Sequence, residues 1–191
     1  MAAFAQQKSY IPPEDYLEIE RAAEYKSEYL NGEMWAMSGA TESHTIIVSN
    51  LIASVHTQFK GRPCRVYGTD MRVQVDITGL YTYPDVTLIC GERRFLDDRR
   101  DTLLNPLVII EVLSPSTADY DRGAKFAHYR QLASLQEYLL VAQDERHVMH
   151  YLRQPDNRWL LEEFRSQDDA IDLPSVTCRL SMNEVYENIE D

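Results

Sequence analysis

The pattern of apolar and polar residues along the chain predicts helices and strands in mixed order. Apolar residues recur with helical spacing from Thr41 to Lys60, and Gly61 follows where the helix should end. Residues 107–113 are almost wholly apolar, which is typical of a central strand covered on both faces. Residues 137–142 form a second apolar segment and predict another strand. These segments indicate an α/β protein.

The first forty residues predict a short helix followed by a hairpin. Pro12 and Pro13, followed by acidic residues, favour a helix start, so we expect a helix over residues 12–24. Asn31-Gly32 is a strong signal for a tight two-residue turn, which predicts a hairpin over residues 25–38.

The other segments predict a sheet with helices on both sides. The order of strands and helices in the middle of the chain favours a central mixed β-sheet flanked by helices, in one domain over residues 1–191. We expect one or two strands in 65–76, a strand in 83–90, a loop or short helix in 91–105, a helix from Ser116 or Thr117 to about Ser134, an antiparallel pair from 146–152 and 159–164, and a short helix in 180–187.

Composition narrows the cellular setting. No apolar run is long enough to span a membrane, and residues 1–10 do not resemble a secretory signal, so we expect a cytoplasmic protein without membrane contact. The spacing of Cys64, Cys90 and Cys178 matches no zinc site, and their odd number does not suggest a disulfide framework. We expect buried or idle thiols in a reducing compartment.

The net charge of −12 argues mildly against a protein that coats nucleic acid. It does not exclude phosphate chemistry, because sites that hold divalent cations are themselves acidic.

Two acidic residues suggest a metal site. Asp85 follows Pro84 early in one predicted strand, and Glu111 lies near the end of an apolar one, where an unpaired charge is costly to bury. If the strands are neighbours, the two carboxylates can approach to about 5 Å. Mg²⁺, or Mn²⁺ in its place, would relieve their repulsion and still bind phosphate oxygens. The alternatives are a turn residue for Asp85 and a buried ion-pair partner for Glu111.

The helix after Glu111 supplies a cation. Asp121, Lys125 and Tyr129 share one helix face. A lysine directed at the carboxylates would stabilise the negative charge that develops during phosphoryl transfer. A solvated helix surface is the alternative for Lys125, and pairing with Lys125 is the favoured role of Asp121.

These motifs resemble those of a known superfamily. Pro-Asp, a strand glutamate and a lysine are the signature of the PD-(D/E)xK nucleases. More closely, the chain is similar to a large bacterial family of restriction-endonuclease-like proteins of unknown function, over roughly residues 10 to 165. The matching stretches are Tyr83 to Val86, Ile109 to Thr117, Asp121 to Lys125, Tyr129, Glu137-Tyr138, Glu28 to Glu33 and His44.

The resemblance implies a restriction-endonuclease-like fold and an Mg²⁺-dependent active site. The chain departs from the superfamily pattern at Leu113, which stands where the tripeptide has lysine. By resemblance, Lys125 takes over the role of that lysine.

Other residues have weaker claims to the site. Glu28 is a candidate third metal ligand, with a cross-strand or exposed role as the alternative. His44 faces inward from the first turn of its helix, either as a core histidine or as a catalytic group near the phosphate. Four arginines between residues 93 and 100 could contact a nucleic-acid backbone, but the acids among them favour a self-paired surface loop.

We therefore expect a DNA endonuclease in which Asp85 and Glu111 bind the metal and Lys125 acts on the phosphate. A homodimer would place two sites on two strands. A catalytically inactive binding or scaffold protein with the same fold is the alternative, and hydrolysis of another phosphate ester is a third possibility.

Overall fold

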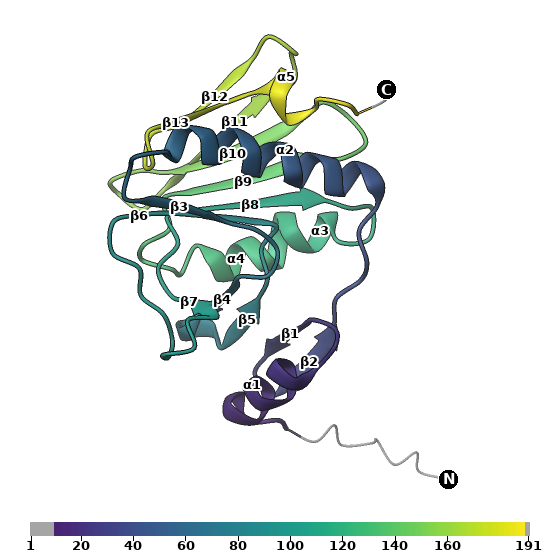
Figure 1. Cartoon of the computed structure of the whole chain (residues 1–191), viewed down its shortest axis with the longest axis vertical. Helices are drawn as coiled ribbons and strands as arrows, with labels where there is room; N and C mark the ends of the chain where they lie inside the picture. Colours follow the sequence, from purple (N-terminus) through teal and green to yellow (C-terminus); the bar gives the residue numbers. More distant parts are fainter. Residues whose placement is uncertain (1–9, 190–191) are drawn as a thin grey trace.

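A computed structural model of the 191-residue chain describes residues 10–189, and a six-stranded sheet lies at its centre (Figure 1). The strand order is β11-β10-β9-β8-β6-β3. Strands β8 and β9 are parallel, and the other neighbours are antiparallel, so the sheet is mixed as predicted. The bounds are β3 (Cys64–Tyr67), β6 (Val86–Cys90), β8 (Val108–Leu113), β9 (Glu137–Ala142), β10 (Val148–Arg153) and β11 (Trp159–Phe164).

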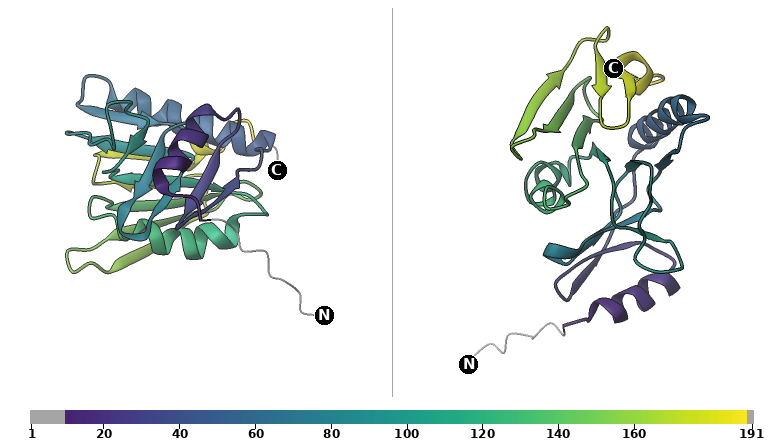
Figure 2. Two further views of the ribbon diagram at one scale, coloured as in Figure 1. Left: turned by 90° about the horizontal axis from the view of Figure 1, so that it is seen from below. Right: turned by 90° about the vertical axis from the view of Figure 1, so that its left-hand side faces the viewer.

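Helices cover both faces of this sheet (Figures 1 and 2). Helix α2 (Glu42–Phe59) lies on one face. A helical segment made of α3 (Ala118–Tyr120), a π-helical turn (Asp121–Lys125) and α4 (Phe126–Tyr129) lies on the other. Among residues 10–189, no helix is long and apolar enough to cross a membrane.

The alternation of side chains along β8 decides which face each residue joins. Val108, Ile110 and Val112 pack in the core on the α2 side. Ile109 and Leu113 pack on the side of the helical segment. Because successive side chains of a strand point to opposite faces, Glu111 points toward the helical segment as well.

A five-stranded sheet in the order β2-β1-β5-β4-β7 lies below the central one in Figure 1. Helix α1 (Pro13–Ala22) packs against it through Tyr16, whose ring stacks on that of Tyr29 at a centroid distance of 4.7 Å. Its elements are β1 (Ser27–Leu30), β2 (Glu33–Ala36), β4 (Arg72–Val75), β5 (Leu80–Thr82) and β7 (Thr102–Leu103), with a short 3₁₀ turn η1 (Asp76–Thr78) between β4 and β5.

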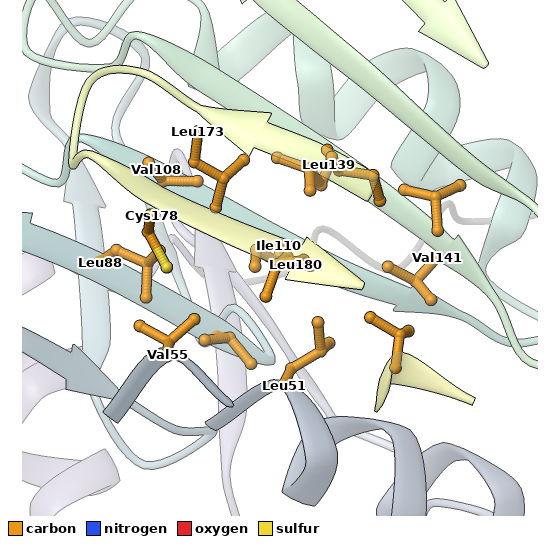
Figure 3. Close-up of a cluster of buried hydrophobic side chains, with 14 of the residues drawn as sticks. Leu51, Val55, Leu88, Val108, Ile110, Leu139, Val141, Leu173, Cys178 and Leu180 are labelled. Atoms are coloured by element: carbon orange, nitrogen blue, oxygen red, sulfur yellow. The ribbon is translucent and has the colours of Figure 1, made fainter. Parts of the chain in front are cut away.

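The largest apolar core lies between α2, the central sheet and a C-terminal hairpin. Figure 3 shows Leu51 of α2, Ile110 of β8 and Leu180 of the hairpin directed toward one another. The hairpin consists of β12 (Ala170–Leu173) and β13 (Cys178–Ser181), and helix α5 (Met182–Val185) follows it. Each fully buried aliphatic side chain there contributes about 1.5–3 kcal/mol of transfer free energy.

The predicted start of the helix at Thr41 and the predicted hairpin turn are both confirmed in detail. Thr41 is the N-cap of α2, and its hydroxyl accepts a hydrogen bond from the backbone N–H of His44 at 3.2 Å. Asn31 and Gly32 join β1 to β2 with φ angles of 47° and 94°, the left-handed values that a tight hairpin turn requires.

Other predicted elements need correction. The helix predicted to reach Ser134 ends at Tyr129, and the side chain of its N-cap Thr117 makes no capping hydrogen bond. The predicted strand over residues 83–90 begins at Val86, and the separate strand β5 precedes it. The hairpin β12–β13 was not predicted.

The expectation of idle thiols was wrong for two of the three cysteines. Cys64 and Cys90 stand opposite each other on the paired strands β3 and β6 and form a disulfide. Their separation in sequence carries no information about strand register, which is what brings them together. Cys178 is a free, buried thiol, as expected.

Candidate active site

The pairing of β6 with β8 brings Asp85 and Glu111 together. Val86 stands opposite Ile110 in this antiparallel pair, so the next residues, Asp85 and Glu111, face each other beyond it. The backbone N–H of Asp85 lies 3.3 Å from Oε2 of Glu111, and the backbone N–H of Val112 donates to Oδ2 of Asp85 at 2.7 Å. Each carboxylate therefore accepts a hydrogen bond from the backbone of the neighbouring strand, close to the other acid.

Lys125 extends from the π-helical turn into this acidic cluster. Its Nζ lies 2.9 Å from Oε1 of Glu111, 3.4 Å from Oε1 of Glu28 and 3.4 Å from Oδ1 of Asp121. Its side chain is only 7% exposed. The pairing with Asp121 agrees with the sequence interpretation. π-Helical turns within helices are frequent at functional sites.

Glu28 reaches the cluster from the other sheet. It lies on β1, and the hydroxyl of Thr82 on β5 donates a hydrogen bond to its Oε1. Glu28 and Thr82 are both buried. The central and five-stranded sheets thus both contribute acidic side chains to the surroundings of Lys125.

His44 approaches Asp85 from the first turn of α2. Its Nε2 lies 3.2 Å from Oδ2 of Asp85, and both side chains are mostly buried. Burial lowers the pKa of His44, but the hydrogen bond and charge of Asp85, together with the charge of Asp121, outweigh it and raise the pKa above 6.5. A protonated His44 would offset part of the charge of Asp85.

Two tyrosines of the helical segment complete the surroundings. The hydroxyl of Tyr129 donates to Oε1 of Glu111 at 2.8 Å. The hydroxyl of Tyr120 is buried and has no hydrogen-bond partner, and its pKa is raised by burial and then by the charge of Glu28. Tyr129 shared the predicted helix face with Lys125, but no sequence signal indicated Tyr120 or Thr82.

The cluster carries more negative than positive charge. Burial is the main cause of the raised pKa of Glu111; Lys125 opposes the shift, and the charges of Asp85 and Asp121 add to it. Burial lowers the pKa of Lys125, but the surrounding carboxylates outweigh it and raise that pKa well above its usual value. Three carboxylates thus surround the Lys125 amine, with Asp85 beside Glu111, and a divalent cation would relieve the repulsion among them.

The residues of the acidic cluster form only part of a metal-binding site. Among residues 10–189, no group of three or more His, Cys, Asp or Glu side chains stands ready to hold an ion. The donor chemistry nevertheless suits Mg²⁺, which binds through one or two carboxylates and keeps several waters. Asp85 and Glu111 supply such a pair, with Glu28 beyond the Lys125 ammonium.

The family of the chain follows from sequence comparison. A family model described as "Uma2: Putative restriction endonuclease" matches residues 13–183. The chain belongs to this family. The match covers most of the chain and includes every residue of the candidate site.

Relatives and a solved structure agree with membership in the Uma2 family. The chain is 33% identical over 181 residues to the "Uncharacterized protein slr1290" of Synechocystis sp., covering 94% of this chain and 93% of that protein. It is 36% identical over 158 residues to "Uncharacterized protein sll1609" of the same organism, covering 83% and 89%. A crystal structure from Anabaena variabilis, described as "a putative nuclease belonging to DUF820", matches with a TM-score of 0.76 and 21% identity, over 92% of this chain and 97% of that one.

These comparisons confirm the predicted family resemblance and the mixed α/β fold flanked by helices. At 21% identity, the structural match speaks for the fold alone.

Proposed function

We propose that this protein is a divalent-metal-dependent endonuclease that hydrolyses phosphodiester bonds of DNA. The observation that carries the proposal is the convergence of Asp85, Glu111 and Lys125 from three separate segments, with the Lys125 ammonium 2.9 Å from Glu111. Membership in a restriction-endonuclease family supports the same chemistry.

Asp85 and Glu111 would hold Mg²⁺ or Mn²⁺, and Glu28 would be an additional ligand. A bound metal supplies a more acidic water and polarises the phosphoryl oxygen. The backbone N–H of Val112 and the hydroxyl of Tyr129 hold the two carboxylates in place through their hydrogen bonds. Such support from neighbouring groups fixes the orientation of metal ligands.

Lys125 would act on the phosphate, and His44 would act on the attacking water. Lys125 supplies a buried positive charge where negative charge develops on the phosphoryl oxygens. His44 adjoins Asp85 at the more accessible side of the cluster, where its imidazole can orient the attacking water. A homodimer would present two such sites to the two DNA strands.

The test is nicking of supercoiled plasmid with Mg²⁺ or Mn²⁺ by wild type, Glu111→Gln and Glu18→Gln. Glu18 lies exposed on α1 and serves as the matched control. Metal-dependent nicking should be lost in Glu111→Gln, by a factor of about 10² or more, and kept in the control. Equal nicking by all three proteins would contradict the proposal.

One observation favours a second candidate, a catalytically inactive binding or scaffold protein. Lys125 already contacts three carboxylates, an arrangement that can serve stability alone. No nicking, together with no Mg²⁺ or Mn²⁺ binding by calorimetry, would support this alternative. A panel of small phosphate esters would test for a different hydrolase.

A further inference from the structure

Two acids of the loop between β6 and β7 form ion pairs with arginines outside the loop. Residues 92–101 contain four arginines and four acids. Asp101 Oδ2 lies 2.8 Å from Nε of Arg21 on α1 and 3.3 Å from the guanidinium of the buried Arg72. Asp97 also pairs with Arg21, at 2.7 Å. Two of the four acids therefore bind arginines outside the loop, and the predicted self-pairing of the loop was wrong.

The arginines of the loop are left without acidic partners. Within residues 10–189, none of the four forms an ion pair, and all four are exposed. Of the loop acids only Glu92 and Asp98 form no ion pair outside the loop, so the remaining exposed groups of the loop have an excess of two positive charges. The rest of this acidic chain has the opposite balance. The four residues, called the arginine face below, are Arg93, Arg94, Arg99 and Arg100.

The loop is held in a defined conformation. The N–H of Leu96 donates to Thr102 O at 3.0 Å, and the N–H of Leu104 donates to Arg94 O at 2.9 Å. Arg100 adopts a left-handed φ of 59°, and its guanidinium stacks 4.6 Å from the centre of the Phe95 ring. A non-glycine residue with such a φ is kept only where its surroundings impose it.

We propose that the arginine face binds phosphates of the DNA backbone. Guanidinium groups match phosphate oxygens in a two-bond geometry, and a rigid loop loses little entropy when it binds. Such contacts position a nucleic acid without reading its sequence. The choice of DNA as the ligand rests on the proposed function, whereas the charge arrangement of the loop is independent of it.

The position of the loop sets the distance between the arginine face and the candidate active site. Asp85 precedes the five-residue β6 and the arginine face follows its far end, so the strand separates them by about 17 Å at 3.3 Å per residue. For DNA that runs along this strand, the face would contact the backbone about five base pairs from the cleaved bond, at roughly 3.4 Å per pair.

The test compares two triple variants with the same net charge. One is Arg93→Gln/Arg94→Gln/Arg99→Gln, which leaves the left-handed Arg100 in place. The other is Arg158→Gln/Arg165→Gln/Arg179→Gln, which removes three exposed arginines that pair with acids elsewhere. Binding of a fluorescein-labelled DNA duplex is followed by anisotropy in EDTA, between about 50 and 200 mM NaCl.

We expect the loop variant to bind about tenfold or more weakly than wild type, with its log–log salt slope reduced by about 2–3. The control variant should bind as wild type does. Equal losses in both variants would show a general charge effect and overturn the proposal. So would loop-dependent binding to anionic phosphatidylglycerol vesicles with none to DNA.

The design keeps the two proposals separable. Because binding is measured without metal, a loop-dependent DNA affinity would stand even if the protein never nicks plasmid. Conversely, Glu111→Gln could abolish nicking while the loop variant binds DNA as tightly as wild type. That result would overturn the proposal for the arginine face and leave the proposed nuclease function standing.

Discussion

The ammonium of Lys125 lies 2.9 Å from the carboxylate of Glu111, although one residue belongs to the π-helical turn and the other to the central strand β8. Each is costly to bury without the other, so the contact couples stability to the arrangement of the proposed site.

Removing the amine should strongly destabilise the metal-free protein. Lys125→Met leaves Glu111, Glu28 and Asp121 buried without their cation, so we expect a loss of about 3–5 kcal/mol in the free energy of unfolding. Urea denaturation at neutral pH measures it, with the exposed Lys60→Met as control. Adding Glu111→Gln should recover part of the loss. A loss below about 1 kcal/mol would show that the ion pairs contribute little.

The titration of His44 reports its contact with Asp85. In metal-free wild type we expect an imidazole pKa above 6.5, and in Asp85→Asn a lower pKa, because the hydrogen bond and charge of Asp85 no longer oppose the effect of burial. NMR of the ring protons measures both. Since the folded pKa is raised, this contact stabilises the fold below about pH 6.5 and is lost as pH rises through the folded pKa. An unchanged pKa in the variant would contradict the contact.

The Asp101 ion pairs should fail only in strong acid. Hydrogen bonding from Arg21 is the main cause that lowers the pKa of Asp101 from 3.8 to about 2. Because the folded pKa is depressed, the stability is present above 3.8 and lost as pH falls through about 2. We expect Asp101→Asn to cost about 1 kcal/mol near neutral pH, since solvent screens the partly exposed pair.

Thermal unfolding of wild type, Asp101→Asn and the exposed control Asp98→Asn measures this difference. The gap between wild type and Asp101→Asn should close as the pH is lowered toward 2. A gap that stays constant over this range would show that the charge of Asp101 is not its source.

The disulfide predicts a specific thiol count. Unfolding without reductant should expose one reactive thiol, that of Cys178, and unfolding with reductant should expose three. Reduction should lower the free energy of unfolding by about 3 kcal/mol, and Cys64→Ser/Cys90→Ser should be insensitive to reductant. Three thiols in the untreated protein would place Cys64 and Cys90 in the reduced state.

Much of the site could be predicted because its polar side chains are costly to bury without a partner. A glutamate within an apolar strand and a histidine on the inward side of a helix each require a partner, and the structure supplies partners for Glu111 and His44. The helix that carries Lys125 was also predicted correctly to follow β8 in the sequence. The parallel strands β8 and β9 require such a crossover segment between them.

The missed features depend on tertiary register. The pairing of Cys64 with Cys90 follows from the alignment of two strands, which neither sequence segment reveals alone. Tyr120 precedes a π-helical turn, and that turn changes the helical phase on which a 3.6-residue pattern relies. Strands β5 and β12 have only three and four residues, too few for a clear alternating pattern.

The central claim is that the acidic cluster holds a divalent cation, and calorimetric titration of Mn²⁺ into wild type and Asp85→Asn tests it most directly. We predict saturable binding to wild type, because the cation relieves the repulsion among the carboxylates of the cluster. The variant should bind at least about tenfold more weakly. Equal Mn²⁺ binding by the two proteins, or none by wild type, would contradict the account.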